Sequence, residues 1–105
     1  MYEHEKCRIR KKLTRDDIVC GIAEEAAELG QAALKYRRTL PTSKNVTPVS
    51  VTEALEHIEE EIVDVLMYFE VMGYPLEALV AQAQSSPKWK RWLERLESTN
   101  CDGLR

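Results

Sequence analysis

Two short acidic patterns contain the residues of this chain that are best suited to chemistry. The first holds Glu24, Glu25 and Glu28, and the second, about thirty-five residues later, holds Glu61 and Asp64. Each pattern interrupts an apolar stripe with helical spacing. Carboxylate oxygens suit hard divalent cations such as Mg²⁺, Mn²⁺ or Ca²⁺. The sequence therefore predicts one shared metal site, with Glu25, Glu28, Glu61 and Asp64 as its ligands.

The apolar stripes indicate that these carboxylates face the core. On a helix with about 100° per residue, a strip roughly 60° wide contains Glu25. The apolar members of that strip are Ile18, Ile22, Leu29, Ala33 and Tyr36. Of the eleven residues from Ile62 to Met72, nine are apolar and Asp64 is one of the two exceptions. Buried carboxylates without partners are unfavourable and repel one another, which a bound cation remedies. The alternative is that each pattern forms an ordinary solvated helix face.

Size and composition predict one globular domain over residues 1–105, with 44% hydrophobic and 31% charged residues. The net charge of −3 gives no reason to expect attraction to nucleic acid or to a membrane surface. No apolar run approaches the length of a membrane span, and the polar start does not resemble a signal peptide. Cys7, Cys20 and Cys101 form no C-x-x-C pair, which favours reduced thiols in a cytoplasmic setting.

The elements that must position the carboxylates are all predicted to be helices. Thr14 with Asp17 and Ser50 with Glu53 have the spacing of capping boxes, which start helices. The predicted helices cover a segment before residue 14 and residues 14–38, 50–73, 76–84 and 87–97. Residues 40–48 are a loop by composition, and no alternating strand pattern occurs. We therefore expect an all-α bundle of four to five helices, completed by oligomerisation because apolar residues such as Val63, Met67 and Val71 exceed what one chain can cover.

The two acidic patterns resemble the paired motifs of the MazG-like all-α nucleoside triphosphate pyrophosphohydrolases, which are related to dimeric dUTPases and phosphoribosyl-ATP pyrophosphatases. The resemblance covers roughly residues 14–80 and lies in E-E-x-x-E at residues 24–28 and E-x-x-D at residues 61–64. It implies that Glu25, Glu28, Glu61 and Asp64 bind Mg²⁺, for which Mn²⁺ can substitute, and form the catalytic centre. It further implies cleavage of a nucleoside triphosphate between its α and β phosphates, to monophosphate and pyrophosphate, by a homodimer or homotetramer.

Residues 79–86 lack the Lys and the Asn that many relatives carry after the second motif to contact phosphate. Cations elsewhere are therefore the candidate substrate-binding residues: Lys35, Arg38, Lys88 and Arg91. Each is also a plausible surface residue. Glu25 and Glu28 are both candidates for the general base, and His57 is expected at the surface or beside a metal ligand.

Two other classes of protein use similar helices. Di-iron bundles also carry inward carboxylates, but they need E-x-x-H pairs, and the residue three before His57 is Ala54. The remaining alternative is not an enzyme: either a bundle that binds a metal or a nucleotide for regulation, or a dimerising module in which the acids are structural. The missing Lys and Asn favour this alternative.

Overall fold

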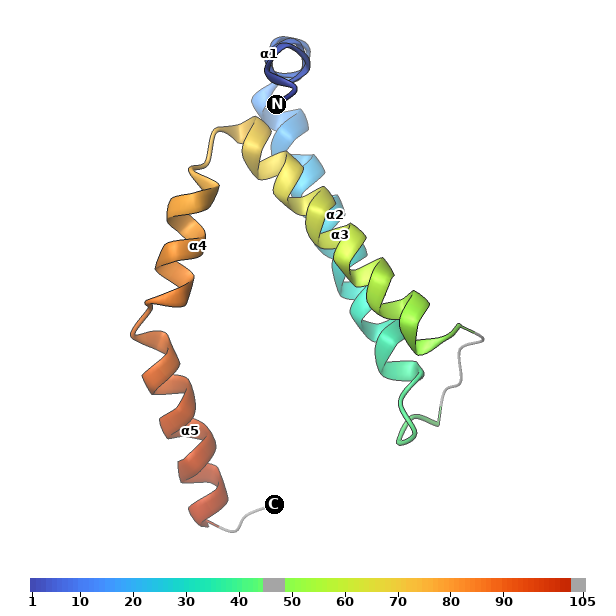
Figure 1. Cartoon of the computed structure of the whole chain (residues 1–105), viewed down its shortest axis with the longest axis vertical. Coiled ribbons are helices and arrows are strands. Elements are labelled where there is room, and N and C mark those ends of the chain that lie inside the picture. The colour runs from blue at the N-terminus through green and yellow to red at the C-terminus, as the bar shows by residue number, and fades with distance from the viewer. Residues whose placement is uncertain (45–48, 103–105) are drawn as a thin grey trace. The chain divides into compact units, whose positions relative to one another are not determined.

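The computed structural model describes residues 1–44 and 49–102, with side chains described as far as Ser98. Every regular element within these residues is a helix, which confirms the all-α prediction. In chain order the helices are α1 (Glu3–Lys12), α2 (Arg15–Arg38), α3 (Val51–Met72), α4 (Leu76–Gln84) and α5 (Lys88–Asp102) (Figure 1). The Thr-Pro end of the predicted loop lies outside the described residues. No helix within the described part is long and apolar enough to cross a membrane.

The chain divides into two compact units, Met1–Tyr74 and Pro75–Arg105. In the first unit α2 and α3 lie side by side along most of their length, and α1 packs against α3 (Figure 1). The second unit consists of α4 and α5. Both acidic motifs belong to the first unit. A single domain over residues 1–105, with all helices in one bundle, stays a prediction.

Local signals fix the ends of the two long helices. The Thr14 hydroxyl accepts a hydrogen bond from the Asp17 N–H at 3.1 Å, and the Asp17 carboxylate accepts one from the Thr14 N–H at 2.8 Å, which confirms the capping box. At the start of α3 the Ser50 hydroxyl accepts from the Glu53 N–H at 3.1 Å. Gly73 ends α3 with a φ of 96°, a left-handed conformation that glycine adopts without steric cost.

The short helix α1 is tied to the C-terminal end of α3. Arg10 donates to the carbonyl oxygens of Glu70 at 3.0 Å and Val71 at 3.3 Å, and Lys6 pairs with the Glu70 carboxylate at 3.0 Å. The last carbonyls of a helix have no partners within the helix and carry the negative end of its dipole. Two cations from α1 therefore stabilise the end of α3.

Small residues line the contact between α2 and α3. Gly21 and Ala32 of α2 and Ala54 of α3 are buried there, together with Ile18. Ala33 belongs to the core-facing strip predicted from the sequence, but Ala33 is exposed and Ala32 is the buried residue. The reason is that α3 packs against the face of α2 that contains Gly21 and Ala32. This face is slightly rotated about the helix axis from the face that carries the largest apolar residues.

Gly21 leaves room for the ring of Tyr68 on α3, because a Cβ added there would overlap that ring. We expect Gly21→Ala to lower the free energy of unfolding by about 1 to 3 kcal/mol, despite the better helix propensity of alanine, since the overlap forces the ring or the helix to shift. Gly30→Ala is the matched control on the same helix, because nothing lies within 4 Å of its added Cβ. It should stabilise by about 0.5 to 1 kcal/mol. Thermal and urea unfolding measure both values, and equal stabilisation by the two variants would contradict the packing at Gly21.

The second unit begins after the turn at Pro75. Its first helix has the predicted bounds, whereas α5 reaches Asp102 and so extends beyond the predicted end near residue 97. Trp89 and Trp92 stack on each other with ring centroids 5.7 Å apart, and the Trp89 indole donates to the Ala83 carbonyl at 2.6 Å. The indole pair therefore anchors the start of α5 to the end of α4.

Candidate metal centre

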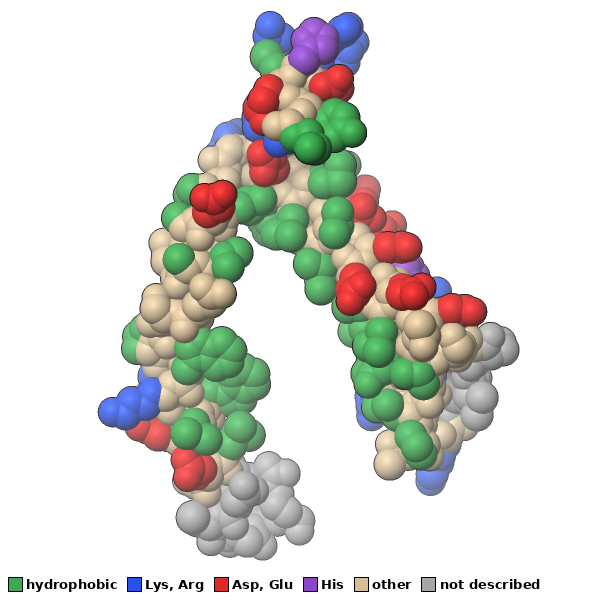
Figure 2. Space-filling model, in the orientation of Figure 1, with side chains coloured by type: hydrophobic (Ala, Val, Ile, Leu, Met, Phe, Trp, Pro, Cys, Tyr) green, Lys and Arg blue, Asp and Glu red, His purple; other side chains and the backbone are tan. Residues whose placement is uncertain are grey.

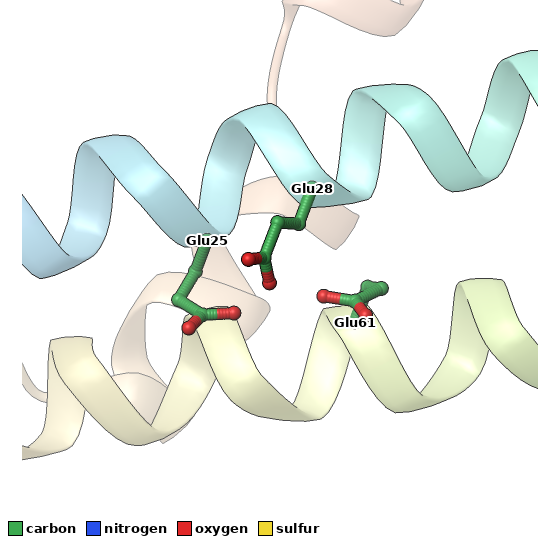
Figure 3. A group of neighbouring side chains, drawn as sticks. All are labelled: Glu25, Glu28 and Glu61. Atoms are coloured by element: carbon green, nitrogen blue, oxygen red, sulfur yellow. The ribbon is translucent and has the colours of Figure 1, made fainter.

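Three carboxylates from the two motifs converge between α2 and α3. Glu25 and Glu28, one turn apart on α2, point toward α3, and Glu61 points back from α3 (Figure 3). One oxygen from each of the three lies within 4.8 Å of the others. Helical geometry brings Glu25 and Glu28 to the same face, and the small residues of the α2–α3 contact allow Glu61 to reach them.

Burial makes this cluster different from an ordinary acidic surface. Glu61 is 9% exposed and is the buried charged residue among the described side chains. One oxygen of Glu25 and one of Glu61, Oε2 in both cases, are buried and have no hydrogen-bond partner. An unpartnered buried carboxylate oxygen is strongly unfavourable. The alternative of two solvated acidic faces therefore does not describe Glu25 and Glu61.

Electrostatics act most strongly on Glu25. Its pKa is raised above the ordinary value, first because burial removes water from the carboxyl group and then because Glu28 hydrogen bonds to it and repels its charge. The charges of Asp64 and Glu61 raise the pKa further. Protein groups thus favour the protonated form of Glu25, and a divalent cation bound at this position would have to compete with that proton.

Asp64, the fourth predicted ligand, is close enough to influence Glu25 but does not belong to the group of three oxygens. Its side chain is half-buried, one turn after Glu61 on α3. The structure therefore brings three of the four predicted ligands together and places the fourth beside them. Glu24 is exposed, as expected for a residue that faces outward.

His57 lies beside Glu61, a predicted metal ligand. A position beside a metal ligand was one of the two positions expected for His57. Its Nε2 is 3.2 Å from Glu61 Oε1, across one turn of α3. The sequence contains the signal for this pair, because residues four apart on a helix are neighbours. The contact between Gly21 and Tyr68 was not predicted, although a glycine inside a helix one turn before the first motif was a signal for close packing.

The predicted cationic residues lie outside the group of three carboxylates. Lys35 and Arg38 are exposed residues of α2, about 10 Å and about 15 Å beyond Glu28 along the helix axis. Arg38 lines a hollow of about 480 Å³ at the end of α2. Lys88 and Arg91 belong to the second unit, where they line a hollow of about 780 Å³ on α5. Phosphate contacts by these four residues stay predictions.

The donor set fits a hard divalent cation. All the donors are carboxylate oxygens, two of the residues have a buried oxygen without a hydrogen-bond partner, and like charges crowd together. Mg²⁺ and Mn²⁺ prefer such ligands, whereas the set offers neither the sulfur nor the multiple imidazoles typical of zinc or copper sites. A cluster of carboxylates of this kind can hold a cation that in turn binds phosphate oxygens.

Comparisons with known proteins do not assign the chain to a family. No protein-family model matches it, and neither the curated proteins nor the solved structures include a significant match. The likeness to the MazG-like enzymes therefore consists of the two acidic motifs at residues 24–28 and 61–64.

Proposed function

We propose that this chain is a Mg²⁺-dependent nucleoside triphosphate pyrophosphohydrolase, which releases a monophosphate and pyrophosphate. The observation that carries the proposal is the convergence of Glu25, Glu28 and Glu61 within 4.8 Å, with unpartnered oxygens on two of them. These residues come from two motifs about thirty-five positions apart in the sequence, and they are three of the four ligands that the resemblance implies. Mn²⁺ would substitute for Mg²⁺, and Asp64 would complete the set of ligands.

The chemistry of phosphoanhydride hydrolysis explains the need for such a site. Negative charge on the phosphate oxygens must be neutralised and a water molecule must be positioned in line with the bond that breaks. A bound Mg²⁺ would supply the neutralising charge and acidify a coordinated water. Glu25 and Glu28 would provide the base that accepts the proton of the water, since both carboxylates lie at the cluster.

The test is a panel of standard and modified nucleoside triphosphates, incubated with the protein and Mg²⁺ or Mn²⁺. We expect monophosphate and pyrophosphate in equal amounts for at least one nucleotide, measured by chromatography and a coupled pyrophosphate assay. Excess EDTA should stop the reaction. Diphosphate with orthophosphate as first products, or full turnover in EDTA, would contradict the proposal. Nucleotide binding without turnover would instead support a non-catalytic regulatory bundle.

We also propose that the chain works as a homodimer or homotetramer. Apolar side chains remain exposed along α3, including Val63 at 52% and Met67 at 60%, with Ile62 and Leu66 nearby. Figure 2 shows hydrophobic side chains gathered on one side of the α2–α3 pair and acidic ones on the other. Such a continuous apolar surface is typical of an interface.

Sedimentation velocity at micromolar concentration measures the assembly directly. The parent should sediment as a dimer or tetramer of the 12.1 kDa chain. Met67→Lys should shift the population toward the monomer, because it places a charge in the apolar surface. Gln31→Lys, which adds the same charge at an exposed position of α2, is the control and should leave the mass unchanged. A monomeric parent would rule out the proposed assembly.

A further inference from the structure

The two oxygens of the Glu61 carboxylate have different surroundings. Oε1 lies 3.2 Å from His57 Nε2, so the imidazole lies against this oxygen. Oε2 is buried and has no hydrogen-bond partner. One oxygen therefore has a protein group against it, and the other has no protein partner.

This asymmetry bears on which cation the site prefers. Ca²⁺ takes about six to eight oxygen ligands and often uses both oxygens of one carboxylate, at about 2.3–2.6 Å. Mg²⁺ requires a nearly octahedral arrangement at about 2.0–2.1 Å, in which a carboxylate binds through one oxygen. A carboxylate with one oxygen engaged elsewhere thus loses the two-oxygen mode that Ca²⁺ often uses and keeps the one-oxygen mode of Mg²⁺ or Mn²⁺.

We propose that His57 is a positioning residue that determines metal selectivity, because it lies against Glu61 Oε1 and so leaves Oε2 as the oxygen through which Glu61 binds a cation. The inference rests on the metal site of the proposed function and adds a residue outside its set of carboxylates. The side chain of His57 is 40% exposed, so it is not part of the packed contact between α2 and α3. Its replacement should therefore change the ligand geometry without removing core packing.

Three single variants separate an effect on the geometry of the metal ligands from effects of the charge of residue 57 and of protein folding. His57→Ala removes the imidazole and frees Oε1. His57→Gln keeps an N–H that can reach Oε1 from the same turn of α3. His4→Ala removes the other histidine of the chain, an exposed residue of α1, and is the matched control. Far-ultraviolet circular dichroism compares the helix content of all four proteins.

Metal binding to the full chain, without nucleotide, is the readout. The signal of free Mn²⁺ in electron paramagnetic resonance gives the Kd for Mn²⁺, and competition against Mn²⁺ gives the Kd for Ca²⁺, at one fixed pH. Both ions carry the same charge, so a change in the charge of residue 57 shifts both Kd values in the same direction. The ratio of the two Kd values reports mainly the ligand geometry.

We expect the preference for Mn²⁺ over Ca²⁺ to fall about ten-fold in His57→Ala, which is the scale of effects caused by partners of metal ligands. His57→Gln and His4→Ala should keep the parental ratio. A parental ratio in His57→Ala, or an equal loss in His57→Gln, would overturn the role of His57 while leaving the metal site intact. If the parent itself binds no Mn²⁺, the proposed metal site fails together with this inference.

Discussion

Replacing Glu61 by glutamine should abolish metal-dependent pyrophosphate release, with a loss of at least roughly a thousand-fold, or about 4 kcal/mol of transition-state stabilisation. The variant removes the negative charge of Glu61, the buried carboxylate of the cluster. The proposed cation needs this charge for binding. The same change should leave unchanged or raise the melting temperature of the metal-free protein. The physical reason is that Glu61 Oε2 has no partner and its charge repels that of Glu25.

Adding Mg²⁺ should raise the melting temperature of the parent but not of Glu61→Gln, since a ligand stabilises only the state that binds it. Asp64→Asn should follow the same pattern, with the activity lost and the metal-free stability retained. Glu60→Gln is the control, because Glu60 is an exposed neighbour outside the cluster. If both Glu61→Gln and Asp64→Asn clearly destabilise the metal-free protein, these carboxylates have structural partners and the metal site is wrong.

Single replacements of Lys35, Lys88 and Arg91 by alanine should identify the cation that holds the phosphates. A triphosphate carries several negative charges, and the carboxylates around the cation add more, so a positive side chain must approach the substrate. We expect at least one variant to lose roughly ten- to a thousand-fold in kcat/KM, or about 1.4 to 4 kcal/mol. Arg91 leads the group in α5, because a guanidinium can bind phosphate through two parallel hydrogen bonds.

Lys11→Ala is the control for the loss of one positive charge, since Lys11 is exposed on α1. Its kcat/KM should stay within about two-fold of the parent. Steady-state kinetics with the preferred nucleotide at saturating Mg²⁺ give all four values. If Lys35, Lys88 and Arg91 variants all keep parental kcat/KM, the phosphates are held without these side chains and the assignment of all three is incorrect.

Periodic patterns and end signals predicted the helices well because they depend on residues close in the chain. The capping box at Thr14 and the left-handed Gly73 required only local hydrogen bonds and backbone conformation, and both are present. The end of α5 was harder to predict, since residues 98–102 lack a stop signal such as proline. Extension of that helix depends on continuing the hydrogen-bond pattern, which most residue types permit.

The sequence by itself determined the all-α class and the residue types of the candidate site, since both follow from spacing along a helix. Only the tertiary structure decided which face of α2 meets α3. The face that contains Gly21 and Ala32 packs against α3, and the face that contains Ala33 does not. That choice brings Glu25, Glu28 and Glu61 together while leaving Asp64 beside the group. The physical reason is that helix packing depends on how closely two backbones can approach, and the approach is set by small residues whose importance no hydrophobic pattern reveals.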